Sequence, residues 1–185
     1  MEKFIEDEVR LIHPHENIVR SSVQWVKTLY LLSIRKDNNE LDKVFKGSLS
    51  EANKKINKDW VAEIDAEIEM PAKTHQGWAK IAWTYGMREL KKAVEIYKQN
   101  KSYKFDDFYY KEVIERVLAR GGDTDTNAAI VGGMVGAIVG FKNLPGDYLR
   151  KMIELDFSKK ENRMRNDRNR FYEPRSAFVT IYQFL

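Results

Sequence analysis

Apolar residues recur along most of the chain with a period near 3.6, the spacing of one face of a helix, and no convincing set of alternating strands is present. Helices are predicted from the positions of apolar residues and of the glycines and prolines that interrupt them. The predicted ranges are 14 to about 40, then 40–55, 60–69, 75–99, 105–122 and 147–155. The pattern therefore predicts an all-α fold.

The most apolar predicted helix covers about residues 128–141 and is unusually rich in glycine. Its small residues fall four apart in two rows, which are Gly132, Gly136 and Gly140 in one and Ala129, Gly133 and Ala137 in the other. Rows of small residues allow neighbouring helices to approach closely. We expect this helix at the centre of an orthogonal or irregular bundle, with neighbours on both sides.

The chain has no internal repeat and no recognisable linker, so residues 1–155 are predicted to form one domain. Residues 156–185 are predicted to be a basic tail, because arginine and lysine are concentrated in "SKKENRMRNDRNRFYEPR". The last ten residues, "SAFVTIYQFL", are typical of an extended edge or a short helix. Most of the formal net charge of +4 comes from the tail.

Composition excludes several classes of protein. The chain is 43% hydrophobic and 32% charged, as in globular proteins, and its longest apolar run is shorter than the ~20 residues that span a bilayer. The N-terminus lacks a secretory segment, so we expect a cytoplasmic protein with no membrane partner. A nucleic-acid partner is not favoured, because no recognised DNA or RNA module precedes the basic tail.

Cysteine is absent and histidine occurs three times, which excludes disulfides, thiol catalysis and thiolate metal sites. Any metal would be held mainly by oxygen. His15 and His75 are expected to be exposed. The aromatic residues Trp78, Trp83 and Tyr85 are expected in the core, because helices normally use such side chains for packing.

The segment "RGGDTDTNAA" places Asp123, Asp125 and Thr126 just before the apolar helix. Two interpretations stay open. One carboxylate or hydroxyl is a normal helix N-cap. Two carboxylates this close repel unless a cation offsets them, which favours a site for Mg²⁺, Mn²⁺ or Ca²⁺. An EF-hand is excluded, because Ala128 and Met134 stand where that loop requires glycine and glutamate.

The longer string "GGDTDTNAAIVGGMVGAIVG", followed by "NLP", resembles the C-terminal signature of the ADP-ribosylglycohydrolases, an all-α family. Upstream, "VRLIHPHENIVRSSVQWVKTLYLLS" is similar to the family's Thr-His-Pro-His segment, which opens a helix. The segments "GWAKIAWTYGMRELKKAVEIYK" and "FYYKEVIERVLARGGDTDT" follow in the family's order. The resemblance covers about residues 9–152.

This resemblance implies Mg²⁺-assisted hydrolysis of the glycosidic bond between ADP-ribose and a modified acceptor, with ADP-ribose or an ADP-ribosylated protein as partner. Asp123, Asp125 and Thr126 match the family's C-terminal metal ligands, and Asp125 is the one expected to bridge two ions. Substrate-binding positions carried over are His13, Gly121 and Gly122. Two cations can orient ribose hydroxyls and stabilise charge in an oxocarbenium-like transition state.

The sequence also departs from the family pattern. Ile12 stands where the family usually has threonine, so His13 is alternatively a turn cap beside Pro14, which would take the first helical position. The family's N-terminal Thr-Asp-Asp motif is absent and no catalytic residue can be assigned. We therefore expect the C-terminal half of the family fold. A homo-oligomer, a separately encoded N-terminal half or a rearranged core would each complete it. The alternative is an inactive remnant that binds ADP-ribose or a protein.

Overall fold

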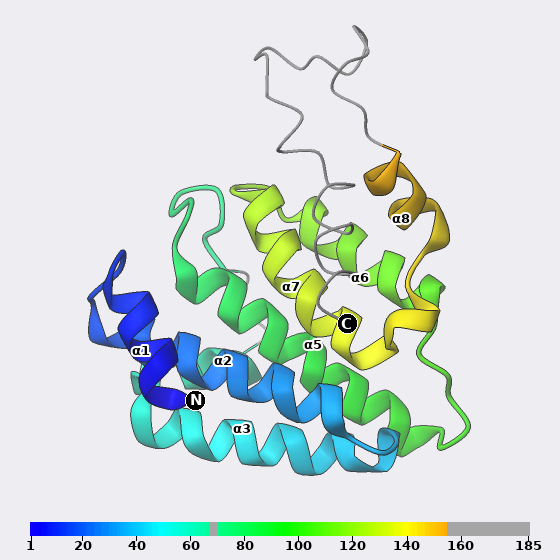
Figure 1. Ribbon diagram of the computed structural model, residues 1–185, viewed down its shortest axis with the longest axis horizontal. Helices are drawn as coiled ribbons and strands as arrows, with labels where there is room; N and C mark the ends of the chain where they lie inside the picture. The colour runs from blue at the N-terminus through cyan, green and yellow to red at the C-terminus, as the bar shows by residue number, and fades with distance from the viewer. Residues whose placement is uncertain (67–69, 155–185) are drawn as a thin grey trace, which may run out of the picture. The chain divides into compact units, whose positions relative to one another are not determined.

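The computed structural model describes residues 1–66 and 70–154, and these contain eight α-helices, two 3₁₀ helices and no strand (Figure 1). The α-helices are α1 (Glu2–Arg10), α2 (Glu16–Ile34), α3 (Leu41–Lys55), α4 (Lys58–Asp65), α5 (Ala79–Gln99), α6 (Asp107–Ala119), α7 (Thr124–Val139) and α8 (Gly146–Ile153). The 3₁₀ helices are η1 (Asn38–Glu40) and η2 (Phe141–Asn143). The prediction of an all-α fold is confirmed. Within the described residues, no helix has the length and apolar character needed to cross a membrane.

The chain divides into two compact units, Met1–Asn143 and Leu144–Leu185. The first unit holds α1 to α7, and the described part of the second holds α8. The predicted domain boundary after residue 155, the basic tail and "SAFVTIYQFL" lie outside the described residues, so these assignments stay predictions.

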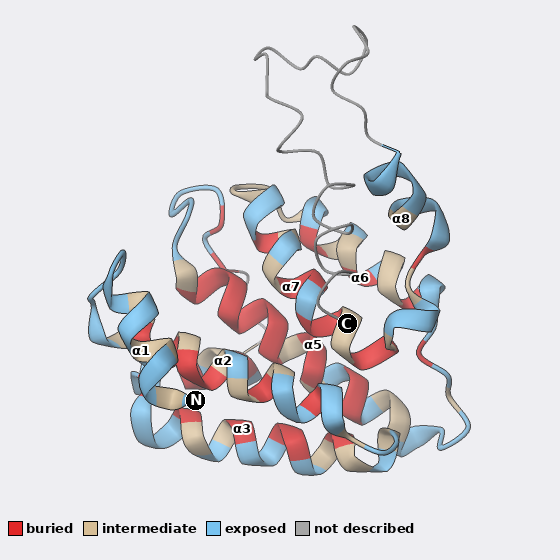
Figure 2. Ribbon diagram, in the orientation of Figure 1, coloured by how far each residue is buried: buried red, intermediate tan, exposed pale blue. Residues whose placement is uncertain are grey.

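Helix α5 forms the core of the first unit. It contacts α2, α3, α4 and α7, and it contributes more buried residues than any other described helix (Figure 2). Trp83 and Tyr85 of α5 are 3% and 1% exposed, which confirms their predicted place in the core. The expectation fails for Trp78, which precedes α5 and is 38% exposed.

The glycine-rich helix α7 packs against α5 and α6 and touches α2. One of its predicted rows is packed, because a Cβ atom at Gly132 would lie 2.9 Å from the hydroxyl oxygen of Tyr110 on α6. The other row is open at its start, since Ala129 and Gly133 are exposed and a Cβ at Gly133 would meet no atom within 4 Å. The central position predicted for this helix, with neighbours on both sides, is thus not confirmed.

A chain of buried polar side chains joins α5, α2 and α3. The indole N–H of Trp83 donates to Gln24 Oε1 at 2.7 Å, and Gln24 Nε2 donates to Thr28 Oγ1 at 3.0 Å. The hydroxyls of Thr28 and Ser48 lie 2.7 Å apart. Buried polar groups are costly unless they are hydrogen-bonded, so this chain fixes the relative positions of the three helices.

The N-terminal residues form helix α1, which was not among the helices predicted from the sequence. Lys27 on α2 pairs with Glu2 of α1 and with Glu51 of α3, the latter at 2.6 Å. Helix α2 begins at Glu16, two residues after Pro14, so the prediction that Pro14 occupies the first helical position is wrong. His15 is the N-cap, and its Nδ1 accepts the backbone N–H of Asn17 at 3.2 Å.

Candidate metal centre

The turn between α6 and α7 is built from two glycines with positive φ. Gly121 and Gly122 have φ values of +72° and +77°, a region that other residues adopt at a cost. A Cβ atom at position 122 would lie 2.2 Å from the carbonyl oxygen of Ala72, and one at 121 would lie 3.0 Å from Lys73 Cε. The backbone of this turn therefore rests against residues 70–78, the segment that leads into α5.

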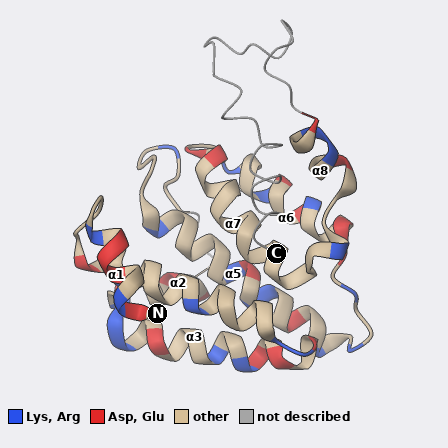
Figure 3. Cartoon of the chain, in the orientation of Figure 1, with Lys and Arg blue, Asp and Glu red and all other residues tan. Residues whose placement is uncertain are grey.

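Asp123 and Asp125 follow this turn at the start of α7, where Figure 3 shows acidic residues. Asp123 occupies the N-cap position, and its side chain accepts no hydrogen bond from the helix, so the capping interpretation is wrong for Asp123. Its Oδ2 atom lies 3.8 Å from the position of a Cβ at Gly77, a glycine of the adjoining segment. The first carboxylate is thus held beside the segment 70–78 without a helix-capping role.

The two aspartate side chains are close enough to interact. The neighbouring Asp123 side chain is the main cause that lowers the pKa of the Asp125 carboxyl, since a carboxyl that holds a proton can donate a hydrogen bond to the other. The backbone N–H of Thr126, which donates to Asp125 Oδ1 at 3.0 Å, lowers this pKa further. The fold therefore brings the predicted pair of carboxylates together, with the exposed Thr126 next in the chain.

These residues fit Mg²⁺ in chemical type, since carboxylate and hydroxyl oxygens are the ligands that hard cations prefer. They do not supply a full set. No group of three or more His, Asp or Glu side chains able to hold a metal occurs within residues 1–66 and 70–154. Asp123, Asp125 and Thr126 thus provide part of a coordination sphere that needs further oxygen ligands or waters.

His13 lies in the α1–α2 connection, which is apart from the start of α7 in Figure 1. It is exposed, and its backbone N–H donates to the carbonyl oxygen of Val9 at 2.8 Å. The helix cap that the alternative interpretation gave to His13 is made by His15, which is exposed as predicted. A role for His13 at the substrate stays a prediction.

The segment 70–78 is the part of this site that sequence reasoning missed. His75 is exposed, as predicted, and its ring lies 5.6 Å from that of Trp78. Trp78 also packs edge-to-face on Trp60 of α4, at 6.5 Å between ring centroids. The glycines of the two connections, Gly77 and Gly122, were the available signal, because glycine is common where a backbone is approached closely.

An apolar cavity lies near the carboxylates, where α2, the start of α5 and α7 meet. Its volume is about 260 Å³, and its lining includes Trp25, Val26, Ala79 and Ile130. Ile130 follows Asp125 by five residues, a rise of about 7.5 Å along the helix. The carboxylate pair thus has an apolar cavity within two helical turns of it.

Comparison with known proteins identifies the family of this chain. The sequence model of the ADP-ribosylglycohydrolase family matches residues 2–175, most of the chain. No curated protein and no solved structure gives a significant match. Because the family match spans well over half of the chain, from α1 through the Gly-Gly-Asp-Thr-Asp-Thr turn and beyond α8, this protein belongs to the ADP-ribosylglycohydrolase family.

Proposed function

We propose that this protein is a hydrolase that cleaves the glycosidic bond between ADP-ribose and a modified acceptor with the help of Mg²⁺. The observation that carries the proposal is the position of Asp123 and Asp125 at the start of α7, on a turn whose glycines pack against a neighbouring segment. Rigid support of this kind is what a metal site needs, because small displacements of the ligands weaken it.

In this proposal Asp123, Asp125 and Thr126 hold the metal, and Asp125 is placed between two ions. The bound cations would orient ribose hydroxyls and a water and stabilise developing charge. Gly121, Gly122 and His13 take the substrate-binding role in this proposal, and the two glycines also let the turn pack against residues 70–78. The family resemblance supports these assignments, and the chain offers no residue that we assign as the general acid or base.

We further propose that a second polypeptide completes the metal site, either another copy of this chain or one that resembles the family's N-terminal half. The exposed row at Ala129 and Gly133 supports this proposal. It begins one turn after Asp125, and small side chains there would let a partner helix approach closely. ADP-ribose or an ADP-ribosylated protein is the proposed substrate, and the cytoplasm is the proposed location.

The proposal is tested by incubating the purified protein with Mg²⁺ and an ADP-ribosylated peptide or O-acetyl-ADP-ribose, and measuring free ADP-ribose. Release is expected to disappear in Asp125→Ala and to persist in Asp59→Ala, which removes an exposed acid from the first turn of α4. The same assay is repeated over a range of protein concentrations, because completion by a second copy makes activity rise more steeply than linearly.

Binding is measured separately from turnover. Mg²⁺ with ADP-ribose is expected to raise the melting temperature of the wild-type protein and of Asp59→Ala, and to leave Asp123→Ala unchanged. If the protein releases no ADP-ribose at any concentration and is not stabilised by Mg²⁺ with ADP-ribose, the proposed function is wrong. Stabilisation without release would instead favour the ADP-ribose-binding alternative over the enzyme.

A further inference from the structure

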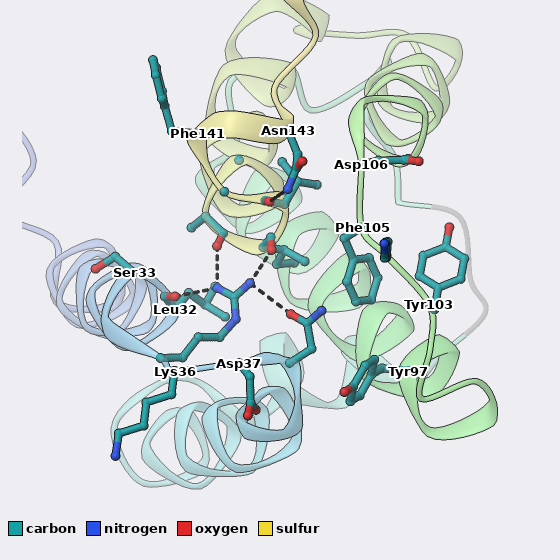
Figure 4. A pocket seen from close by; sticks show the side chains of 18 of the residues that line it. Leu32, Ser33, Lys36, Asp37, Tyr97, Tyr103, Phe105, Asp106, Phe141 and Asn143 are labelled. Carbon is teal, nitrogen blue, oxygen red and sulfur yellow. Dashed lines mark hydrogen bonds between the residues drawn. The ribbon is translucent and has the colours of Figure 1, made fainter.

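A second cleft opens at the end of α7 that is remote from Asp123 and Asp125. It lies where the last turn of α7, the α2–η1 connection and the α5–α6 connection meet (Figure 4). Its volume of about 980 Å³ is at the upper end of the range found for small-molecule sites. Because α7 has 16 residues, which rise about 24 Å in all, this cleft is separate from the proposed metal centre.

The floor of the cleft holds the guanidinium of Arg35. It donates to the carbonyl oxygens of Leu32 at 2.5 Å, Ala137 at 2.6 Å and Ile138, and to Asn38 Oδ1 at 3.3 Å. All these partners are neutral, and among the described residues no carboxylate forms a salt bridge with Arg35, although Asp37 and Glu40 act on its charge from further away. The buried Nε atom of Arg35 has no hydrogen-bond partner. Arg35 therefore places beneath the cleft a positive charge that the two more distant carboxylates offset only in part.

Two lysines of the α5–α6 connection add positive charge at the rim. Lys101 and Lys104 are exposed, and neither forms an ion pair within the residues that the structure describes. The Lys101 ammonium lies 4.7 Å from the centroid of the Tyr97 ring. Lysines that form no ion pair, beside a buried arginine that forms no salt bridge, favour an anionic ligand.

The cleft also contains two aspartates, and each is already engaged at the start of a helix. Asp37 Oδ1 accepts the backbone N–H of Asn39 at 2.8 Å, and Asp106 Oδ1 accepts that of Tyr109 at 3.1 Å. The second oxygen of each carboxylate remains an acceptor for hydroxyl groups. A ligand with both an anionic group and hydroxyls fits this arrangement, whereas an acidic peptide would be repelled by the two aspartates.

Aromatic rings form one wall of the cleft. Tyr97, Tyr103 and Phe105 lie together on one side of it, and Phe141 projects on another (Figure 4). Phe105 is buried, and its ring centroid lies 5.0 Å from that of Tyr103, so these two rings support each other. Tyr97 and Tyr103 are only partly buried, which leaves ring surface available for stacking with a flat ligand.

We propose that this cleft binds a nucleoside phosphate. The base stacks on the Tyr97 wall, the phosphate lies near Lys101, Lys104 and Arg35, and the sugar hydroxyls donate to Asp106. This combination of a flat ring, an anion and hydroxyls matches the three kinds of group that line the cleft. The inference concerns binding at the remote end of α7 and is independent of the proposed metal centre.

The test is calorimetric titration of the full chain with adenosine monophosphate, and separately with adenosine and with inorganic phosphate. Adenosine monophosphate is expected to bind more tightly than either fragment. Tyr97→Ala and Lys101→Gln are each expected to weaken binding about tenfold. Tyr97→Phe, which keeps the ring, and Lys92→Gln, which changes an exposed lysine of α5 outside the cleft, are expected to bind as the wild type does.

Three results would overturn the inference. They are no binding of adenosine monophosphate, binding of inorganic phosphate as tight as that of the nucleotide, and binding that Asp123→Ala weakens while Lys101→Gln does not. The last result would place the nucleotide at the carboxylate end of α7. Amide chemical shifts of the variants, compared with those of the wild type, show whether each variant keeps the native fold.

Discussion

We predict that alanine substitutions at the two neighbouring glycines of the turn before α7 lower the stability of the protein by clearly different amounts. In Gly122→Ala the new methyl group would start 2.2 Å from the carbonyl oxygen of Ala72. Carbon atoms make their best contacts with other heavy atoms at about 3.5–4.0 Å. The obstacle is main chain, which cannot rotate aside as a side chain does. Either the turn or the segment 70–78 must therefore move, and Asp123 moves with it.

The size of the effect follows from two contributions. A non-glycine residue at positive φ costs about 1–2 kcal/mol, and forcing an extra methyl into a filled space costs about 1–3 kcal/mol. Gly122→Ala is therefore expected to lower the free energy of unfolding by about 3 kcal/mol. Gly121→Ala carries the same cost in φ but meets only the flexible side chain of Lys73, so about 1–2 kcal/mol is expected.

Gly133→Ala is the matched control on the exposed row of α7. No atom lies within 4 Å of the new methyl, and alanine is favoured over glycine inside a helix by about 1 kcal/mol. This variant is expected to be slightly more stable than the wild type.

The assay for the three variants is urea denaturation followed by circular dichroism, with the slope of the transition compared among them. The reasoning is refuted if Gly122→Ala is no less stable than Gly121→Ala, because the close contact with Ala72 would then be absent.

Three further predictions concern the packing of α1, α2 and α5. Gly86→Ala puts a methyl group 2.1 Å from the Trp25 ring. The free energy of unfolding is therefore expected to fall by about 1 kcal/mol, and the tryptophan fluorescence emission is expected to shift. Unchanged emission would contradict this contact. Gln24→Leu leaves the buried indole N–H of Trp83 without its acceptor. The free energy of unfolding, measured by urea denaturation, is expected to fall by about 1–3 kcal/mol. An unchanged free energy would show that the buried hydrogen bonds among α5, α2 and α3 are dispensable for stability. The hydrogen bond with Lys27 of α2 lowers the pKa of the Glu2 carboxyl from 4.5. The contact between α1 and α2 through this pair therefore has its full strength above pH 4.5. It is lost as the pH falls through the lowered pKa of Glu2. The amide chemical shifts of α1 are expected to change when the wild-type protein is acidified, and to show the same change at neutral pH in Glu2→Gln. Identical shifts of the wild type and Glu2→Gln at neutral pH would show that this contact does not hold α1.

The positions of α2 to α7 could be predicted from the sequence, because helix periodicity and its interruptions by glycine and proline are local properties. The end of α6 was likewise indicated, since the predicted range 105–122 stops at the glycine pair that follows this helix. The errors also have local causes. Pro14 was assigned to the first helical position, whereas the structure uses the imidazole of His15 as the cap and begins α2 at Glu16.

What only the tertiary structure decided is which segments meet. Nothing in the spacing of residues showed that Gly122 rests on Ala72, or that the Asp123 side chain accepts no hydrogen bond from the first turn of α7. The cleft around Arg35 also could not be predicted, since its lining comes from three connections far apart in the chain. Periodicity records which face of each helix is apolar, and the choice of partner for that face depends on the shapes of side chains that pack together only in the folded protein.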